Sequence, residues 1–261
     1  MRRPKSTRKL QKLAVITSFL LASTSLSAQE VIKIGIPTGL SGANSVVAPS
    51  VVQSAELAVE EINAAGGILG KQVVLEIADD GSGAAGAQKA ADSLIFQKDV
   101  DVLISMQTSA ARNGMLPIVT RGKTPYIYTS LYEGRSCNDY LYANGAVPEQ
   151  MVAPIVDHFM NENGAKTFFL VGSDYSFGRG MLAFTREYIE SKGGQVVGDE
   201  YQPMEATDWT AIISKMRSTK PDAAIFSTAG GAPNVTLQKQ FKAAGIDAHV
   251  GNLSVDEGTA K

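Results

Sequence analysis

Apolar and polar residues follow two alternating patterns over most of the chain. Short runs rich in β-branched residues, such as VIKIGIPT (31–38), are separated by stretches in which apolar residues recur three or four positions apart, as Ala55, Ala58, Val59 and Ile62 do. The first pattern is typical of a buried strand and the second of one helix face. Strands that alternate with helices predict parallel β-α-β units and open, doubly wound sheets.

The same alternation predicts the remaining elements and divides them into two groups. Further strands are predicted at 72–78, 100–106, 124–129, 141–147, 167–173, 195–201, 222–229 and 248–252. A loop-rich stretch at 130–148 interrupts the rhythm, which then restarts. We therefore predict an α/β fold with two lobes, 29–146 and 147–261, each built on a doubly wound parallel sheet, with a cleft between them.

The first 28 residues differ from the rest. They contain six basic residues and no acidic residue, followed by the apolar run Leu13–Leu26 and the small residues Ser27 and Ala28. This order is that of a secretory signal peptide, and the apolar run is shorter than the about 20 residues of a membrane-spanning helix. We predict a signal peptide at 1–28 and a periplasmic location; an uncleaved anchor is the alternative.

Charge and cysteine content narrow the function classes. The full chain has 24 basic and 26 acidic residues and a net charge of −2; without the first 28 residues, 18 basic residues face 26 acidic ones, a net charge of −8. Because affinity for nucleic acid comes from Lys and Arg, an acidic exported chain is a poor nucleic-acid binder. Cys137 is the single cysteine, which excludes an intrachain disulfide.

The strand ends indicate where a ligand would bind. In open parallel sheets, ligands bind outside the carboxyl ends of the strands. This rule selects the segments 37–44, 107–111, 128–133, 173–178 and 227–231.

Five side chains in these segments are candidates for ligand contact. Ser109 and Ser130 offer hydroxyls, and Tyr128, Tyr175 and Phe177 offer rings, which suits a small polar solute with apolar parts. We expect Ser109 to cap the following helix, whose free backbone N–H groups favour a carboxylate or carbonyl oxygen. The alternatives are capping and turn formation alone for the serines, and surface packing alone for Tyr175 and Phe177.

Motifs for phosphate, metal and catalysis are incomplete. AGGILGKQ (65–72) resembles a P-loop, but Ala and Gln stand at its two ends and it follows a helix rather than a strand. There is no G-x-S-x-G elbow, and His158 and His249 lie in helix and strand patterns away from any nucleophile. The pair Asp79-Asp80 follows a strand and would suit metal binding or acid–base work, but a solvated turn is the favoured interpretation. We predict no metal, no cofactor and no enzymatic activity.

Several motifs, taken in order, resemble one family. IKIGIPTGLSG and the helix ending AVEEINAAGGILGKQVVLEIADD look like the start of periplasmic binding proteins of the branched-chain amino acid type. TSAARNGMLPI, YEGRSCNDYLYANGAVPEQ, VGSDYSFGRG and DAAIFSTAGG are similar to the amide- and urea-binding branch of that superfamily. The resemblance covers 31–261. It implies a two-lobed type I fold that closes on a solute and delivers it to an ABC permease.

The resemblance also implies roles for single residues. Ser109 matches the ligand-binding serine of the family's TSAxR segment, and Tyr128 and Ser130 match positions just before YEG. Tyr175 and Phe177 match the aromatic pair of SDYxxxR, which closes from the second lobe. We therefore expect alanine at Tyr175 or Phe177 to weaken binding while changing stability little.

Two departures from the family pattern affect the prediction. Val46 and Val47 stand where relatives often carry an aromatic residue, and the chain stops at Lys261 where relatives continue, so we expect a fragment or a truncated product. We expect the solute to be amino-acid-like or amide- or urea-like. A ligand-sensing regulator or receptor partner with the same fold is the alternative, and an exported hydrolase using Ser109 is the least favoured.

Overall fold

The computed structural model describes residues 30–42, 44–45, 47–81 and 83–255. The predicted signal peptide at 1–28 and Val46 lie outside these residues.

Five parallel strands form the first sheet, in the order β2-β1-β3-β4-β5. β1 lies between β2 and β3, so that Ile34 is beside Leu75 on one side and Val102 on the other. The strands are β1 (Ile32–Thr38), β2 (Val73–Asp79), β3 (Val102–Ser105), β4 (Tyr126–Tyr128) and β5 (Leu141–Ala143).

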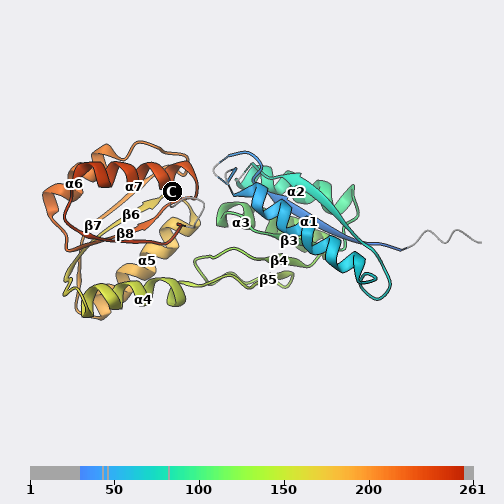
Figure 1. Ribbon diagram of the computed structural model, residues 1–261, viewed down its shortest axis with the longest axis horizontal. Coiled ribbons are helices and arrows are strands. Elements are labelled where there is room, and N and C mark those ends of the chain that lie inside the picture. Colours follow the sequence, from blue (N-terminus) through green and yellow to red (C-terminus); the bar gives the residue numbers. More distant parts are fainter. Residues whose placement is uncertain (1–29, 43, 46, 82, 256–261) are drawn as a thin grey trace, which may run out of the picture. The chain divides into compact units, whose positions relative to one another are not determined.

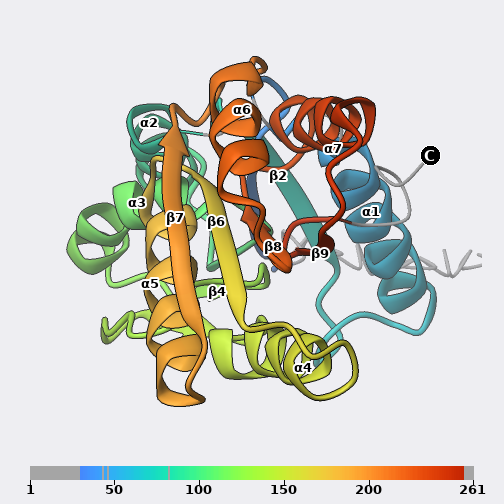
Figure 2. The same ribbon diagram turned by 90° about the vertical axis from the view of Figure 1, so that its left-hand side faces the viewer.

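Four parallel strands form the second sheet, in the order β7-β6-β8-β9, and Figure 2 shows them side by side in this order. They are β6 (Thr167–Ser173), β7 (Gln195–Gln202), β8 (Ala223–Ser227) and β9 (His249–Asn252). The predicted α/β fold with doubly wound parallel sheets is confirmed.

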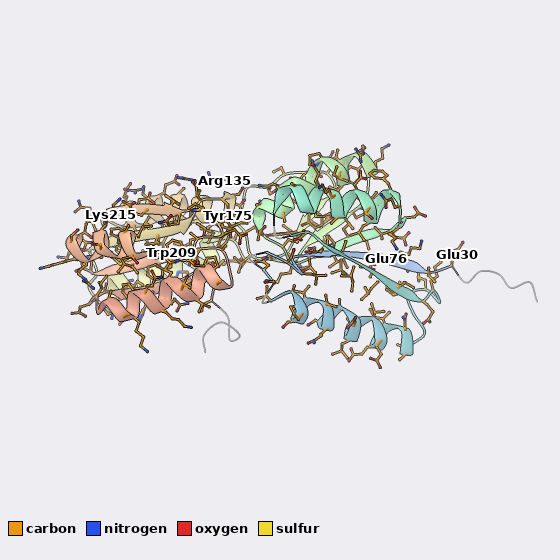
Figure 3. The ribbon with its side chains drawn as sticks, turned by 90° about the horizontal axis from the view of Figure 1, so that it is seen from above. Glu30, Glu76, Arg135, Tyr175, Trp209 and Lys215 are labelled. Atoms are coloured by element: carbon orange, nitrogen blue, oxygen red, sulfur yellow. The ribbon has the colours of Figure 1, made fainter. Side chains whose placement is uncertain are left out.

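Helices cover these sheets. The three that follow strands of the first sheet are α1 (Ala48–Ala64), α2 (Ala84–Phe96) and α3 (Ser109–Gly122). The four of the second sheet are α4 (Pro148–Asn161), α5 (Ser176–Ser191), α6 (Thr210–Thr219) and α7 (Ala232–Ala244). Figure 1 shows α6 and α7 on one side of the second sheet and α4 and α5 on the other, and Figure 3 shows α1 (blue) across the first sheet from α2 and α3 (green). None of the helices in the described ranges is long and apolar enough to cross a membrane.

The second sheet has a core on each face because its strands send successive side chains to opposite sides. Phe168 and Leu170 of β6 pack with residues of α4 and α5, whereas Phe169 and Val171 pack with residues of α6 and α7. Trp209 is fully buried in the α6–α7 core.

The first sheet is covered less evenly. Its α2–α3 face holds a buried cluster that includes Leu103 and Met115. On the other face, α1 buries only Ala48 completely, and Ala58, predicted to lie on its apolar face, is exposed. α1 packs against β2, the edge strand, so part of its surface has no sheet beneath it.

Strand order also indicates where sheets of this kind bind their ligands. In each sheet the first strand along the chain, β1 or β6, has the second strand on one side and the third on the other. The chain therefore leaves β1 and β3, or β6 and β8, in opposite directions, which opens a crevice at their carboxyl ends.

Candidate ligand-binding site

A cavity of about 190 Å³ lies at these carboxyl ends. Segments that follow β1, β3 and β4 of the first sheet line it together with segments that follow β6, β8 and β9 of the second. This is the position that the topology of open parallel sheets favours for a ligand.

All five candidate residues from the sequence line this cavity: Ser109, Tyr128, Ser130, Tyr175 and Phe177. Tyr128 ends β4 and Ser130 follows it, while Tyr175 and Phe177 stand at the start of α5. The structure thus brings the five side chains to one place, and their role in binding remains a prediction.

The start of α3 differs from the prediction. Thr108, not Ser109, is the N-cap residue, and its Oγ1 accepts a hydrogen bond of 3.1 Å from the backbone N–H of Ala111. Ser109 is the first helical residue, so its hydroxyl is available for a different partner. Threonine is also a favoured N-cap residue, and Thr108 was not considered for this position from the sequence.

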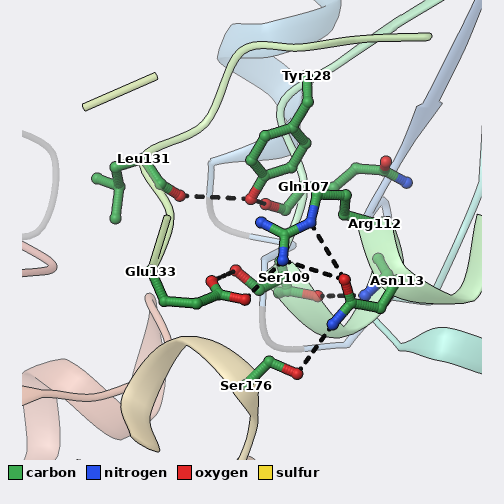
Figure 4. A network of polar contacts seen from close by, with 10 residues as sticks. Gln107, Ser109, Arg112, Asn113, Tyr128, Leu131, Glu133 and Ser176 are labelled. Carbon is green, nitrogen blue, oxygen red and sulfur yellow. Dashed lines mark hydrogen bonds and ion pairs between the residues drawn. The ribbon is translucent and has the colours of Figure 1, made fainter. Parts of the chain in front are cut away.

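The partner of Ser109 is Glu133, which sequence reasoning did not single out (Figure 4). The Ser109 hydroxyl donates to Glu133 Oε2 at 2.6 Å. The other carboxylate oxygen, Oε1, forms an ion pair with Arg112 Nη2 at 2.5 Å. Both carboxylate oxygens of Glu133 are therefore held by residues of α3, one by Ser109 and the other by Arg112.

Arg112 is buried at the centre of this network of polar contacts. Its side chain is 1% exposed, and its guanidinium carbon lies 5.1 Å from the centre of the Tyr128 ring and 5.3 Å from that of Tyr132. Nε and Nη2 also donate to Asn113 Oδ1 at 3.2 and 3.0 Å. A buried guanidinium needs such a partner set, since removing a counter-ion from a buried pair leaves an uncompensated charge.

Tyr128 is buried and its hydroxyl is also engaged. The phenol donates to the backbone oxygen of Gln107 at 2.8 Å. Burial raises the pKa of Tyr128, and the positive charge of the Arg112 guanidinium opposes that rise. The phenol stays neutral, with its proton directed into the protein.

Tyr175 and Phe177 differ in burial, so the expectation that alanine changes stability little is revised for Phe177. Phe177 is 3% exposed and belongs to the core between α4, α5 and the second sheet. Tyr175 is half-buried at the edge of that core, and burial, with Tyr128 and Glu133 nearby, raises its pKa. Their ring centres are 6.1 Å apart.

Other lining residues fall partly within the segments chosen from the sequence. Asn44, Gln107 and Thr228 lie in those segments, whereas Met106 and Val47 lie just outside them. Ser254 and Val255, which follow β9, were missed although the strand-end rule applies to β9 as well.

The aspartate pair considered for metal binding is used structurally. Asp79 accepts hydrogen bonds from the backbone N–H of Gly81 at 2.9 Å and the hydroxyl of Ser41 at 2.7 Å. These contacts lower the pKa of Asp79, and the contact with Gly81 has the larger effect. Asp80 is buried and accepts from the Gln107 amide. No cluster of three or more metal-ligating side chains occurs within the described ranges.

Curated relatives share part of this chain. Leu/Ile/Val-binding protein BraC3 of Rhizobium johnstonii is 28% identical over 226 residues, which cover 82% of this chain and 59% of that protein. Leu/Ile/Val-binding protein homolog 1 of Brucella melitensis is 30% identical over 202 residues, which cover 73% of this chain and 51% of that protein. The chain thus spans little more than half the length of these relatives.

Solved structures share the fold. LivJ of Streptococcus pneumoniae, the substrate-binding protein of a branched-chain amino acid transporter, in complex with isoleucine, superimposes with a TM-score of 0.74 at 26% identity, covering 85% of this chain and 63% of that one. A solute-binding protein of an ABC transporter from Rhodopseudomonas palustris, in complex with 3,4-dihydroxybenzoic acid, has a TM-score of 0.73 at 21% identity, covering 84% and 61%.

A family model described as periplasmic binding protein matches residues 31–261, which include every strand and helix of both sheets. The family and these relatives are substrate-binding proteins rather than enzymes. The chain belongs to the periplasmic binding protein family.

Proposed function

We propose that this chain captures a small amino-acid-like or amide- or urea-like solute in the cavity between its two sheets and delivers it to an ABC permease. The observation that carries the proposal is the cavity itself, which lies at the strand carboxyl ends of both sheets in a chain of a binding-protein family.

The size and lining of the cavity support a small solute. Its volume of about 190 Å³ is below the about 300–1,000 Å³ of pockets for drug-sized ligands. Ser109, Ser130 and Thr228 offer polar groups, and Met106 and Phe177 offer apolar surface. A short molecule with one polar end and a small apolar part fits this lining best.

The candidate residues take two roles in this proposal. Ser109 and Ser130 bind the polar end of the solute from the first sheet. Tyr175, Phe177 and Tyr128 enclose it with their rings, which excludes water and strengthens the polar contacts.

A relative supports the proposal of delivery to a permease, and the N-terminal segment supports the proposal of export. LivJ is by name part of a branched-chain amino acid transporter, and the first 28 residues of this chain have the order of a signal peptide. We propose cleavage of that segment and action in the periplasm beside a permease. The proposal of an amide- or urea-like solute comes from the YEG and SDY motifs, which resemble those of the amide- and urea-binding branch.

Isothermal titration of the full chain tests the proposal. The panel is leucine, isoleucine, valine, acetamide, isobutyramide and urea, and we expect saturable binding of at least one member at a stoichiometry of one. Folded protein that binds none of them contradicts the proposed solute class.

A further inference from the structure

The proton of the Ser109 hydroxyl is already in use. Glu133, paired with Arg112, is a carboxylate and can only accept hydrogen bonds. The 2.6 Å contact between Ser109 Oγ and Glu133 Oε2 therefore uses the single proton of the hydroxyl. Toward the cavity, Ser109 presents oxygen lone pairs alone.

The hydroxyl of Tyr128, like that of Ser109, has no proton available for a ligand. Its phenol proton points to the backbone oxygens of Gln107, at 2.8 Å, and Leu131, at 3.3 Å, so the hydroxyl has no proton left for a ligand. Both residues line the cavity from the first sheet. A ligand group placed against them must donate hydrogen bonds, because two acceptors facing each other leave both without a partner.

The backbone beside Ser109 has the opposite character. The first N–H groups of a helix have no partner within the helix, and Thr108 satisfies that of Ala111. The start of α3 thus provides N–H donors next to a side chain that accepts. A primary amide matches this pair, with its carbonyl toward the helix start and its NH₂ toward Ser109 Oγ. A carboxylate matches the N–H groups but places its second oxygen against Ser109 and the charge of Glu133.

We infer that Glu133 determines specificity: by engaging the Ser109 hydroxyl, it makes the site select solutes with a neutral amide or urea group over the corresponding carboxylates. The inference rests on the proposed function and chooses between its solute classes. Glu133 acts through Ser109 and need not touch the solute. Arg112 contributes by holding the carboxylate in place.

Glu133→Gln reverses the polarity of the network. Arg112 has only donors, so it keeps the amide oxygen of the introduced glutamine toward itself and turns the NH₂ of that side chain toward Ser109. Ser109 Oγ then accepts from the glutamine, and its proton becomes available to the solute. The variant should favour carboxylates more than the original protein does.

Titration with isosteric pairs tests this. The probes are isobutyramide against isobutyrate and acetamide against acetate, measured at pH 7 with the full chain, with Glu133→Gln and with Glu187→Gln. Glu133 lines a second cavity, distinct from the proposed solute site, and the exposed Glu187 lines that second cavity too. The Glu187 variant therefore controls for the loss of one negative charge.

We expect the original chain to bind each amide about tenfold more tightly than its carboxylate or better, because sites with fixed hydrogen-bond polarity discriminate strongly against the mismatched group. Glu133→Gln should lower that ratio about tenfold, and Glu187→Gln should leave it unchanged within about twofold. Ser109→Ala, which keeps the Glu133–Arg112 pair, should weaken amide binding about fivefold and carboxylate binding little.

Three results overturn the inference: a carboxylate preference in the original chain, an unchanged ratio in Glu133→Gln, or an equal change in Glu187→Gln. If Glu133→Gln does not fold, equal losses of amide and carboxylate affinity in Ser109→Ala overturn it instead. Saturable binding of leucine, isoleucine or valine with none of either probe pair also overturns it, while the proposed function stands. Absence of binding across both panels overturns the proposed function and the inference together.

Discussion

Phe177 and Tyr175 lie two residues apart, line the same cavity, and differ in what they contribute. Phe177 is 3% exposed and packs among the buried residues of α4, α5 and β6. Phe177→Ala should therefore lower the free energy of unfolding by about 3–5 kcal/mol, the usual cost of removing a buried phenyl ring. Denaturation by guanidinium chloride, followed by the fluorescence of Trp209, the single tryptophan of the chain, measures this.

Tyr175→Ala serves as the matched comparison. The Tyr175 ring is half-buried, so truncation should change the free energy of unfolding by less than half of the Phe177→Ala effect. Its loss should weaken solute binding by about 1–3 kcal/mol, as for an aromatic group that covers a bound ligand. Equal destabilisation by the two variants, with unchanged affinity for Tyr175→Ala, would place Tyr175 in the core rather than in the binding site.

At the scale of elements, the strands and helices were predictable because each carries its own periodicity. The strand-end rule then placed Ser109, Tyr128 and Ser130 near one another without any motif. The partner of Ser109 was not predictable in this way. Glu133 stands 24 residues further along the chain in a loop, and the path of that loop depends on tertiary contacts rather than on local pattern.

The sequence pattern also did not predict how deeply single side chains are buried. Phe177 and Tyr175 are both aromatic residues that closely follow β6, but only the packing of α4 and α5 decides which ring enters the core. The apolar face of α1 shows the reverse case, since its periodicity is correct and its position over an edge strand leaves it half-exposed.

Asp222 links two strands of the second sheet at the end opposite the cavity. It directly precedes β8, and its Oδ2 accepts from the backbone N–H groups of Lys166 and Thr167 and from the Thr167 hydroxyl, at 2.9, 2.8 and 2.8 Å. These contacts, the Lys166 N–H first, lower the pKa of Asp222 below its ordinary value of 3.8. Asp222→Ala should cost about 1 kcal/mol at pH 7, a modest value because the side chain is exposed.

The pH dependence of this effect has a definite sign. A carboxylate whose pKa is lower in the folded state stabilises fully above the unfolded-state value and loses that contribution as pH falls through the folded-state value. The difference between the original chain and Asp222→Ala should therefore be largest near neutrality and shrink below about pH 4. Asp247→Ala, at another exposed aspartate of the second half, is the control. A difference that grows in acid would contradict the assignment.

At the scale of the whole binding unit, one hydrogen bond joins helices that belong to different sheets. Asn113 Nδ2 of α3 donates to Ser176 Oγ of α5 at 3.0 Å (Figure 4). Both helices begin at the cavity, so this bond forms beside the proposed solute. If the two sheets separate to admit a solute, a contact between α3 and α5 is made only in the closed arrangement and shifts the population toward it.

Ser176→Ala tests whether that bond contributes to closure. The variant removes the hydroxyl that receives Asn113 and leaves the Asn113–Arg112 contacts in place. Because a single hydrogen bond contributes about 0.5–1.5 kcal/mol, the dissociation constant for the tightest-binding member of the screened panel should rise about two- to tenfold. The rise should appear as faster release in stopped-flow measurements, since most affinity changes within one site are changes in dissociation rate.

Ser218→Ala is the matched control, because the Ser218 hydroxyl bonds the Lys215 carbonyl within its own helix, α6. A fall in the free energy of unfolding for Ser176→Ala, with an unchanged release rate, would show that the bond supports the fold and not closure.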